Sequence, residues 1–443
     1  MRTFPSVWLC IFIGISANAQ KKDPAFLQQY KFRTPGYSSV VLTANANGGL
    51  SGGNGSGSPQ YLTISPRLEA TRIISTDNVL ATFNSSVTAG FDYSKYTLAT
   101  GSQHRTNFNY TLSQSLNQKK YKGYRYFQTG YSGQLKQALY SATNNYIKKD
   151  NAAFSNVSYT IGVGRGRIEN VTDAQMADNI LLDLKKNNLL TRDFTADEIN
   201  GLARTITGIN TTRLFDFRRK HIFELKQIDS FLSAKGLVKE KNIDYFTTVN
   251  DNWFYAFNPL RRHGKERFIT LTPLLGIDDK KTIFNTLPAD SSFRSFSKFA
   301  VVTLTLGIDN ARAISLKRQF NKGLSLITSY GYSRDKQTSN TVINEFSASN
   351  IFSSLLGYLE WGYFPHTRTS IITTLTNNFQ WGYQYSEFNN NTGLSFSGNY
   401  FISYDTRLFA NVNSNFNTAR NSVNDFRTTA SASFGFGIQH YIR

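Results

Sequence analysis

The sequence predicts an all-β membrane protein: a closed, antiparallel, up-and-down transmembrane β-barrel of about fourteen strands, with an α-helical insertion. Three observations carry this prediction. The N-terminal residues have the features of an export signal. Apolar residues recur at every second position in many separate segments, and one internal stretch changes this period from two to about 3.6.

The first nineteen residues have the composition of a secretory signal peptide. Arg2 precedes an apolar run at 7–15, and the tripeptide Ala-Asn-Ala at 17–19 supplies a small-x-small cleavage site. Cys10, the only cysteine, lies inside the apolar run, away from the position of a lipid anchor. We therefore expect an exported chain without a thiol, which excludes a disulfide or a cysteine metal site.

The strands are predicted from alternation with period two. In residues 79–93, Val79, Phe83, Val87 and Phe91 occupy odd positions, while Thr, Asn, Ser, Gly and Asp occupy most even ones. Mean hydropathy is −0.36 and no run of about twenty apolar residues follows the signal, so transmembrane helices are not expected. Fourteen segments alternate in this way: 38–47, 60–74, 79–93, 105–117, 121–139, 150–166, 266–278, 298–312, 323–334, 347–363, 369–385, 392–405, 407–417 and 425–442.

The connections alternate between short and long. "STDN" at 75–78 and "NQKK" at 117–120 are short, whereas 48–60 and 278–297 are long. Short turns on one side of a membrane and long loops on the other are the layout of a membrane barrel. An even strand count places both termini on the side of the short turns, although "NWFYAF" at 252–257 offers part of an extra strand and leaves sixteen open.

A soluble β-sandwich or propeller is the alternative fold, but its strands average about five or six residues and face a shared core. The alternating segments are longer, and they carry aromatic rings near their outward-facing ends. Such rings suit the two interfacial girdles of a membrane barrel. The girdle candidates are Tyr93, Trp361, Tyr363, Trp381, Tyr383 and Tyr404.

The insertion is predicted from helical periodicity between about 171 and 249. The first helix is expected in "TDAQMADNILLDLKK". Thr195 and Glu198 form a capping-box pattern that begins the second, and the third is expected at about 212–234 with Gly236 as its stop. The insertion follows the sixth, descending strand, so we expect it on the side of the short turns.

The barrel carries the whole basic excess of the chain. Without the signal the chain has 48 Lys and Arg; residues 171–252 hold twelve basic and twelve acidic residues, which leaves 36 against 17 elsewhere. Nucleic-acid binding is not expected, because no binding fold accompanies the charge. Parity predicts a charged lumen, with side chains that either form a selectivity constriction or pair with one another in a closed interior: Arg67, Glu69, Asp92, Arg105, Arg125, Glu360, Asp425 and Arg427.

The sequence offers no convincing catalytic, cofactor or metal site. Of the five histidines, only His104 lies where a surface hydrolase of the barrel type keeps its base, with Ser102 and Asp92 as weak partners. "GVGRGR" at 162–167 lacks the lysine of a phosphate loop, and its Gly162 and Gly164 are expected to face the lumen. We expect no cofactor, no metal and no enzyme activity.

The mature chain resembles the outer-membrane β-barrels of Gram-negative bacteria, in the broad porin and transporter class. The resemblance rests on the signal peptide, the repeated alternation and the terminal strand "SFGFGIQHYIR" at 433–443. It departs where such barrels end on an aromatic residue, since this chain ends in Ile442 and Arg443. No plug domain of TonB-dependent receptors is visible, and about fourteen strands resembles the fatty-acid-transporter size class.

The resemblance implies location in the outer membrane, contact with outer-membrane lipid and lipopolysaccharide, and assembly by the outer-membrane insertion machinery. It also gives an expected function: a channel or transporter for small, anionic or amphipathic solutes. The alternatives are a membrane-anchored interaction protein whose insertion binds a periplasmic partner, and a surface hydrolase. The expected parts are the signal peptide at 1–19, an N-terminal periplasmic segment at 20–36, strands one to six at 37–167, the helical periplasmic insertion at 168–252 and strands seven to fourteen at 253–443.

Overall fold

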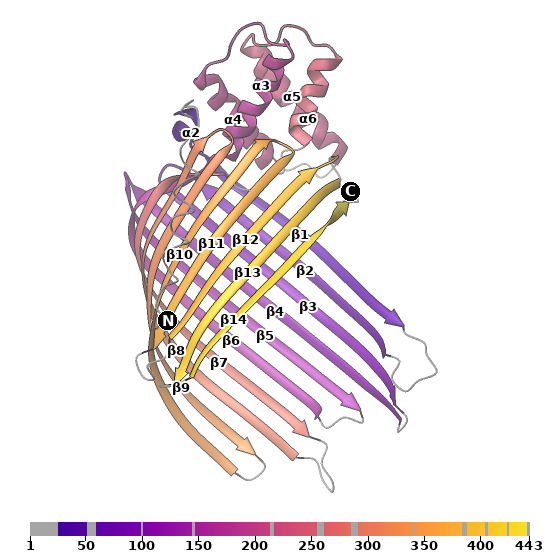
Figure 1. Ribbon diagram of the computed structural model, residues 1–443, viewed down its shortest axis with the longest axis vertical. Coiled ribbons are helices and arrows are strands. Elements are labelled where there is room, and N and C mark those ends of the chain that lie inside the picture. The colour runs from indigo at the N-terminus through magenta and orange to yellow at the C-terminus, as the bar shows by residue number, and fades with distance from the viewer. Residues whose placement is uncertain are drawn as a thin grey trace.

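The computed structural model contains one antiparallel sheet of fourteen strands, ordered β1 to β14 as in the chain (Figure 1). It describes residues 25–50, 59–98, 101–143, 147–212, 217–254, 261–284, 291–339, 342–382, 388–403, 406–422 and 425–440. The strands are β1 Thr34–Leu50, β2 Pro59–Ser75, β3 Val79–Leu98, β4 Gly101–Lys122, β5 Arg125–Thr143, β6 Ile147–Asn170, β7 Arg262–Phe284, β8 Ser291–Ser315, β9 Arg318–Ser339, β10 Val342–His366, β11 Thr369–Gly382, β12 Phe388–Phe401, β13 Thr406–Ser422 and β14 Asp425–His440.

The predicted number and order of strands are confirmed for the described residues, while several strands are longer than predicted. The expected turn "NQKK" at 117–120 is part of β4, so that prediction is wrong. The chain turns instead at Gly123, whose φ of +62° is a conformation that glycine adopts without a steric penalty. Two-residue turns also follow β8 and β10, without a residue of positive φ.

The two faces of the sheet differ as the alternation predicts. On β7, the exposed apolar residues Ile269, Leu271, Leu275 and Ile277 share one face, which we call the outer face. From Ile269 to Ile277 the strand rises about 26 Å at ~3.3 Å per residue. A strand tilt of about 40° reduces this to a height of ~20 Å, which is close to the ~25 Å apolar band of membrane barrels.

The sheet is not closed, which corrects the prediction that the first and last strands pair. Each strand pairs with its neighbours in sequence, but no register joins β1 to β14 among the described residues. Phe434 and Phe436 of β14 are therefore 82% and 80% exposed, whereas Leu304 and Leu306 inside the sheet are 41% and 39% exposed. Two-residue periodicity reports the faces of a strand, but not the curvature of the whole sheet on which closure depends.

The helices pack into a separate domain at one end of the sheet (Figure 1). This helical domain comprises α3 Thr172–Lys186, α4 Ala196–Thr211, α5 Phe217–Ala234 and α6 Ile243–Phe254, with α2 Ala25–Gln29 beside them. Its core contains fully buried leucines and isoleucines, including Ile180, Leu184, Leu202, Ile206 and Leu232. We call this end of the sheet the helical end and the opposite end the far end.

The sequence predicted three of the four long helices. The capping box of α4 is confirmed, because the Thr195 side chain accepts from the Glu198 amide and the Glu198 carboxylate accepts from the Thr195 amide. Gly236 follows α5 with a φ of +63°. The possible extra strand at 252–257 is wrong at 252–254, where the chain is still in α6; 255–260 lie outside the described residues.

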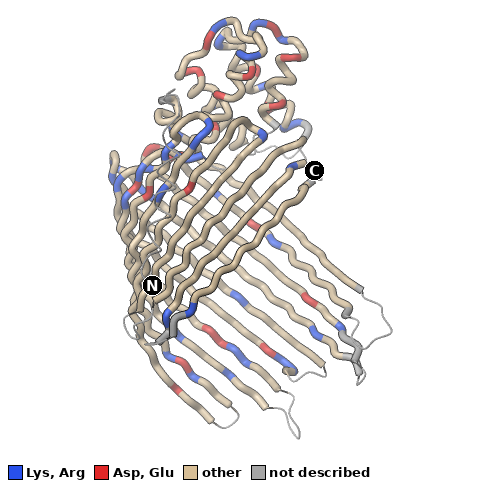
Figure 2. The backbone as a smooth tube through the Cα atoms, viewed as in Figure 1, with Lys and Arg blue, Asp and Glu red and all other residues tan. Residues whose placement is uncertain are grey.

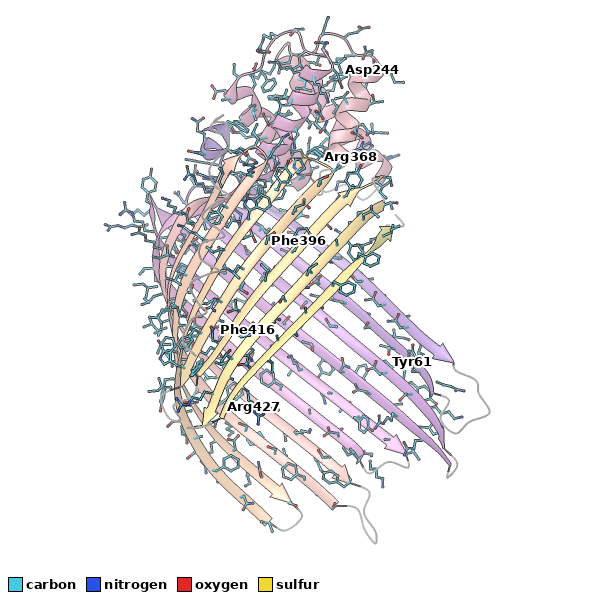
Figure 3. The ribbon with its side chains drawn as sticks, viewed as in Figure 1. Tyr61, Asp244, Arg368, Phe396, Phe416 and Arg427 are labelled. Atoms are coloured by element: carbon cyan, nitrogen blue, oxygen red, sulfur yellow. The ribbon has the colours of Figure 1, made fainter. Side chains whose placement is uncertain are left out.

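The helical domain is fastened to the sheet by two arginines. Arg261, at the start of β7, is fully buried, and its guanidinium donates to the Gln319 side chain and to the carbonyl oxygens of Ser315, Leu316 and Arg318. Burial lowers the pKa of Arg261 to about 10, so the side chain is still charged at neutral pH. Arg368, in the turn after β10, forms an ion pair of 2.5 Å with Asp251 of α6 (Figure 3).

Candidate functional site in the interior of the sheet

The inner face of β2 to β6 is lined at mid-height mostly by uncharged polar side chains, with Glu69 as the one charged residue around the hollow there. Ser86 and Ser113 are hydrogen-bonded across β3 and β4 at 2.7 Å, and Ser132 and Ser158 across β5 and β6 at 2.7 Å. A hollow of about 400 Å³ lies over this surface. Hydroxyl and amide groups offer both donors and acceptors to a polar solute, and their small size leaves room for it.

The charged residues predicted for the lumen do not gather into one constriction. Arg67 and Glu69 form an ion pair along β2, and Asp92 accepts a hydrogen bond of 3.3 Å from Asn107 on the adjacent strand. Glu360 lies at the helical end, whereas Arg427 lies at the far end of β14 (Figure 3). Arg67 and Glu69 therefore pair with one another, and the described charges of this set form no opposed rows; the choice between a constriction and a closed interior stays a prediction.

The remaining three residues of the predicted set are Arg125, Arg105 and Asp425. Arg125 is on the outer face, because it is paired with Arg165, which in turn is paired with Arg267, and it shares the parity of Phe127, so its prediction as a lumen residue is wrong. It is the first residue of β5, and the apolar alternation that fixes parity begins only after it. The side chain of Asp425 lies outside the described residues, while Arg105 is exposed on the inner face as predicted.

A cluster that parity alone did not reveal lies on the inner face near the helical end. Lys119 of β4 and Tyr126 of β5 both donate to the carboxylate of Glu266 on β7. The Lys119 Nζ also lies 4.9 Å from the centre of the Tyr126 ring. β6 separates these strands, so Tyr126 has to cross it to reach Glu266.

Glycine makes this crossing possible. A Cβ atom on Gly164 would lie 2.3 Å from the Tyr126 Cζ and hydroxyl oxygen, and 2.7 Å from the carbonyl oxygen of Arg267. The inward orientation predicted for Gly162 and Gly164 is consistent with this packing. In the "GVGRGR" segment, Gly164 therefore leaves the inner face of β6 without a side chain, and the Tyr126 ring covers it. The sequence signal for this packing was a pair of glycines two residues apart at inward-facing positions.

A second polar cluster continues the first around the helical end. Tyr358 donates to Asp309, and Asn321 donates to Glu360, whose carboxylate also lies 3.7 Å from Arg262. Lys119, Glu266 and Asp309 were not predicted as site residues, because their meeting depends on the register of strands that are distant in sequence. These acids are thus held by donors, and they do not project as free negative charges into the interior.

The predicted girdle residues that are described lie on the outer face near strand ends. Trp361 and Tyr363 stack at the helical end with ring centroids 6.0 Å apart, and Trp381 packs on Phe379 at the far end with centroids 5.6 Å apart. Tyr93 also lies toward the far end. Tyr383 and Tyr404 lie outside the described residues.

The arrangement around His104 does not form a hydrolase site. His104 is on the outer face, where its Nδ1 is 3.1 Å from the Tyr93 hydroxyl, whereas Asp92 is on the inner face beside Asn107. The Ser102 side chain lies outside the described residues.

Among the described residues, no group of three His, Cys, Asp or Glu side chains has the arrangement of a metal site. No described helix combines the length and apolar character that a membrane span requires.

By sequence, the chain matches no described protein family and no curated protein. By structure, it is similar to the ferric yersiniabactin uptake receptor FyuA from Yersinia pestis, with a TM-score of 0.41, 7% identity and coverage of 90% of this chain and 60% of the receptor. It is also similar to the Pseudomonas putida toluene transporter TodX, with a TM-score of 0.32, 7% identity and coverage of 91% and 87%. It is similar as well to the β domain of the Bordetella autotransporter BrkA, with a TM-score of 0.30, 8% identity and coverage of 82% of this chain and 99% of that domain.

These three neighbours are an uptake receptor, a transporter and the β domain of an autotransporter. The chain spans only about 60% of the length of FyuA. All three TM-scores are below 0.5, so the function has to be argued from the chain's own residues.

Proposed function

We propose that this chain is an outer-membrane channel or transporter for small polar solutes, with a preference for anions. The observation that carries the proposal is the contrast between the two faces of the sheet. The outer face exposes an apolar band of about membrane height, while the inner face at mid-height presents serine, threonine and asparagine. Once its edges meet, a ring of fourteen strands encloses more space than side chains fill in an eight-stranded barrel, so small inner residues leave a path for solute.

The preference for anions follows from the distribution of charge. Lys and Arg exceed Asp and Glu by 19 outside the helical domain once the signal is removed. Figure 2 shows many charged residues at the helical end of the sheet. Glu266 there is paired with Lys119 and Glu360 lies 3.7 Å from Arg262, so cations offset these two carboxylates, and the remaining excess of Lys and Arg attracts anions.

Conductance across a planar bilayer tests the proposal. The purified full chain should give discrete channel events, and the reversal potential in a potassium chloride gradient should show chloride passing more readily than potassium. An absence of events under conditions where the chain has inserted into lipid would contradict it. Events with a preference for potassium would contradict the anion preference alone.

The open edges of the sheet need a partner in a bilayer. Unpaired backbone groups in hydrocarbon cost several kcal/mol each, so β1 and β14 must be covered there. We infer that they cover one another in the membrane, since both are edge strands of one curved sheet. Variants that carry one cysteine on β1 and one on β14 should form intramolecular disulfides in lipid under oxidising conditions. Cross-links only between two chains would contradict this inference.

A second candidate function is a membrane-anchored interaction protein. It is favoured by apolar side chains that the helical domain leaves exposed, above all Ile243 and Phe246 at the start of α6, near Asp244 in Figure 3. A periplasmic partner bound there should be captured by the full chain and lost with Ile243→Ser and Phe246→Ser, while conductance is unchanged. Identical recovery with both substitutions would exclude this surface.

A further inference from the structure

Three arginines lie side by side on the outer face near the helical end of the sheet. Arg125 is paired with Arg165 across β5 and β6, and Arg165 with Arg267 across β6 and β7. Neighbouring strands are about 4.8 Å apart, so the three Cα atoms span only ~10 Å. All three side chains are exposed. We call these residues the arginine row.

The arginine row lacks a counter-charge within the described part of the chain. No ion pair or hydrogen bond to another described residue is found for Arg125, Arg165 or Arg267. The acids that follow in register, Glu266 and Asp309, face inward, where Tyr126 and Tyr358 donate to them. Like charges directly opposite one another destabilise a sheet, so a bound anion would relieve a cost that the fold otherwise carries.

An apolar hollow begins at the arginine row. Its volume is about 580 Å³, and the three arginines lie at its margin. Its walls come from β5 to β10 and include Val163, Ile269, Leu306, Ile308, Leu324 and Leu326. A smaller hollow of about 320 Å³ adjoins it and shares Arg267, Ile308 and Leu324; it adds Lys265 and Lys322, together with Glu266 and Asp309, whose carboxylates are bound on the inner face. Cationic and apolar surfaces therefore meet at one place.

We propose that the arginine row binds the phosphate of an anionic phospholipid, whose acyl chain lies in the apolar hollow. The guanidinium fork matches two oxygens of one phosphate, and long arginine side chains at the margin of the apolar band reach the level of the head groups. The assignment rests on the proposed membrane location, which places the helical end at the periplasmic leaflet. That leaflet consists of phospholipid, so the ligand is a phospholipid and not lipopolysaccharide.

Native mass spectrometry of the full chain in detergent tests the proposal. Phosphatidylglycerol, phosphatidylcholine and inorganic phosphate are added in separate titrations. Phosphatidylglycerol should bind most tightly, and substitution of the arginine row by R125Q, R165Q and R267Q should weaken it by roughly fivefold for each arginine removed. The three Arg→Lys substitutions should cause a smaller loss, because lysine keeps the charge without the fork.

A matched control removes three outer-face cations at the far end. Arg294, Lys298 and Arg334 lie on β8 and β9, and Lys298 is paired with Arg334 in the register. Their substitution by glutamine makes the same change in net charge and should leave phosphatidylglycerol binding within about twofold of the original chain.

Three results would overturn the proposal: equal binding of phosphatidylglycerol and phosphatidylcholine, equal loss in the control, or full competition by inorganic phosphate at equal concentration. If the glutamine variant does not fold, the lysine variant and the competition titrations still decide the outcome. Conductance separates this proposal from the proposed function, because a chain that inserts and conducts but binds no phosphatidylglycerol refutes only the lipid site.

Discussion

Replacement of Gly164 by alanine should uncouple the inner-face cluster that joins β4, β5 and β7. The new Cβ atom would lie 2.3 Å from the Tyr126 ring and 2.7 Å from the carbonyl oxygen of Arg267. A backbone carbonyl cannot move away as a side-chain end can, so the Tyr126 ring must move. Its hydroxyl then no longer reaches the Glu266 carboxylate.

The expected cost has two parts. Loss of a hydrogen bond to a charged group costs about 1.5–3 kcal/mol, and overpacking costs a further ~1–3 kcal/mol. Gly164→Ala should therefore reduce the free energy of unfolding by about 2.5–6 kcal/mol. The assay is urea unfolding of the chain in detergent micelles, followed by tryptophan fluorescence and by the shift in gel mobility between folded and unfolded forms.

Gly133 provides a matched control on β5, because a Cβ atom there meets only the Asn156 carbonyl oxygen at 3.7 Å, an ordinary contact. Gly133→Ala should change the unfolding free energy by less than about 1 kcal/mol. Tyr126→Phe removes the hydroxyl alone, so its effect and that of Gly164→Ala should overlap in the double variant by ~1.5–3 kcal/mol. Equal stability of the two glycine variants, or full additivity with Tyr126→Phe, would refute the reasoning.

The remaining predictions concern the helical domain. Arg261→Met should remove the guanidinium donor of the Ser315, Leu316 and Arg318 carbonyl oxygens, of which Leu316 keeps another side-chain donor, Gln175, and should destabilise the junction by about 3 kcal/mol or more. The effect should appear as faster proteolysis between the helical domain and β7, and an unchanged cleavage rate would contradict this. The hydrogen bond from Arg192 lowers the pKa of Glu198 to about 2, so the stability it contributes is present above pH ~4.5 and is lost as pH falls toward 2. Glu198→Gln should lower the stability of α4 by about 1 kcal/mol at pH 7 and make that stability less sensitive to acid. Hydrogen exchange in α4 measures both effects, and identical pH profiles of exchange in the variant and the original chain would exclude the role of Glu198.

Much of the sheet follows from the sequence, because period two is a local property. The face of each residue on β3 or β14 is fixed by its neighbours two positions away, so the outward Phe434 and the inward Arg427 could be assigned without the structure. The same argument failed for Arg125, where the pattern had not yet begun. α6 was missed because its aromatic residues near 252–254 also fit a strand.

The interior could not be predicted to the same depth. Lys119, Tyr126 and Glu266 meet across four strands, and only the registers of β4 to β7 bring them together. Closure of the sheet is also a property of all fourteen strands, and no single segment encodes it. The arginine row could not be predicted for the same reason. Each arginine is an ordinary residue of its strand by sequence, and only the registers of β5, β6 and β7 bring the three together.

The central claim is that alternate residues of the sheet contact lipid, and depth-sensitive quenching along β8 tests it most directly. Single cysteines at Val301 to Leu306, labelled with a fluorophore, are measured in vesicles that contain brominated lipid. We expect strong quenching at Val302, Leu304 and Leu306. Quenching should be weak at Val301, Thr303 and Thr305, which face inward. Equal quenching at all six positions, or fluorescence that the lipid does not affect at any of them, would contradict the account.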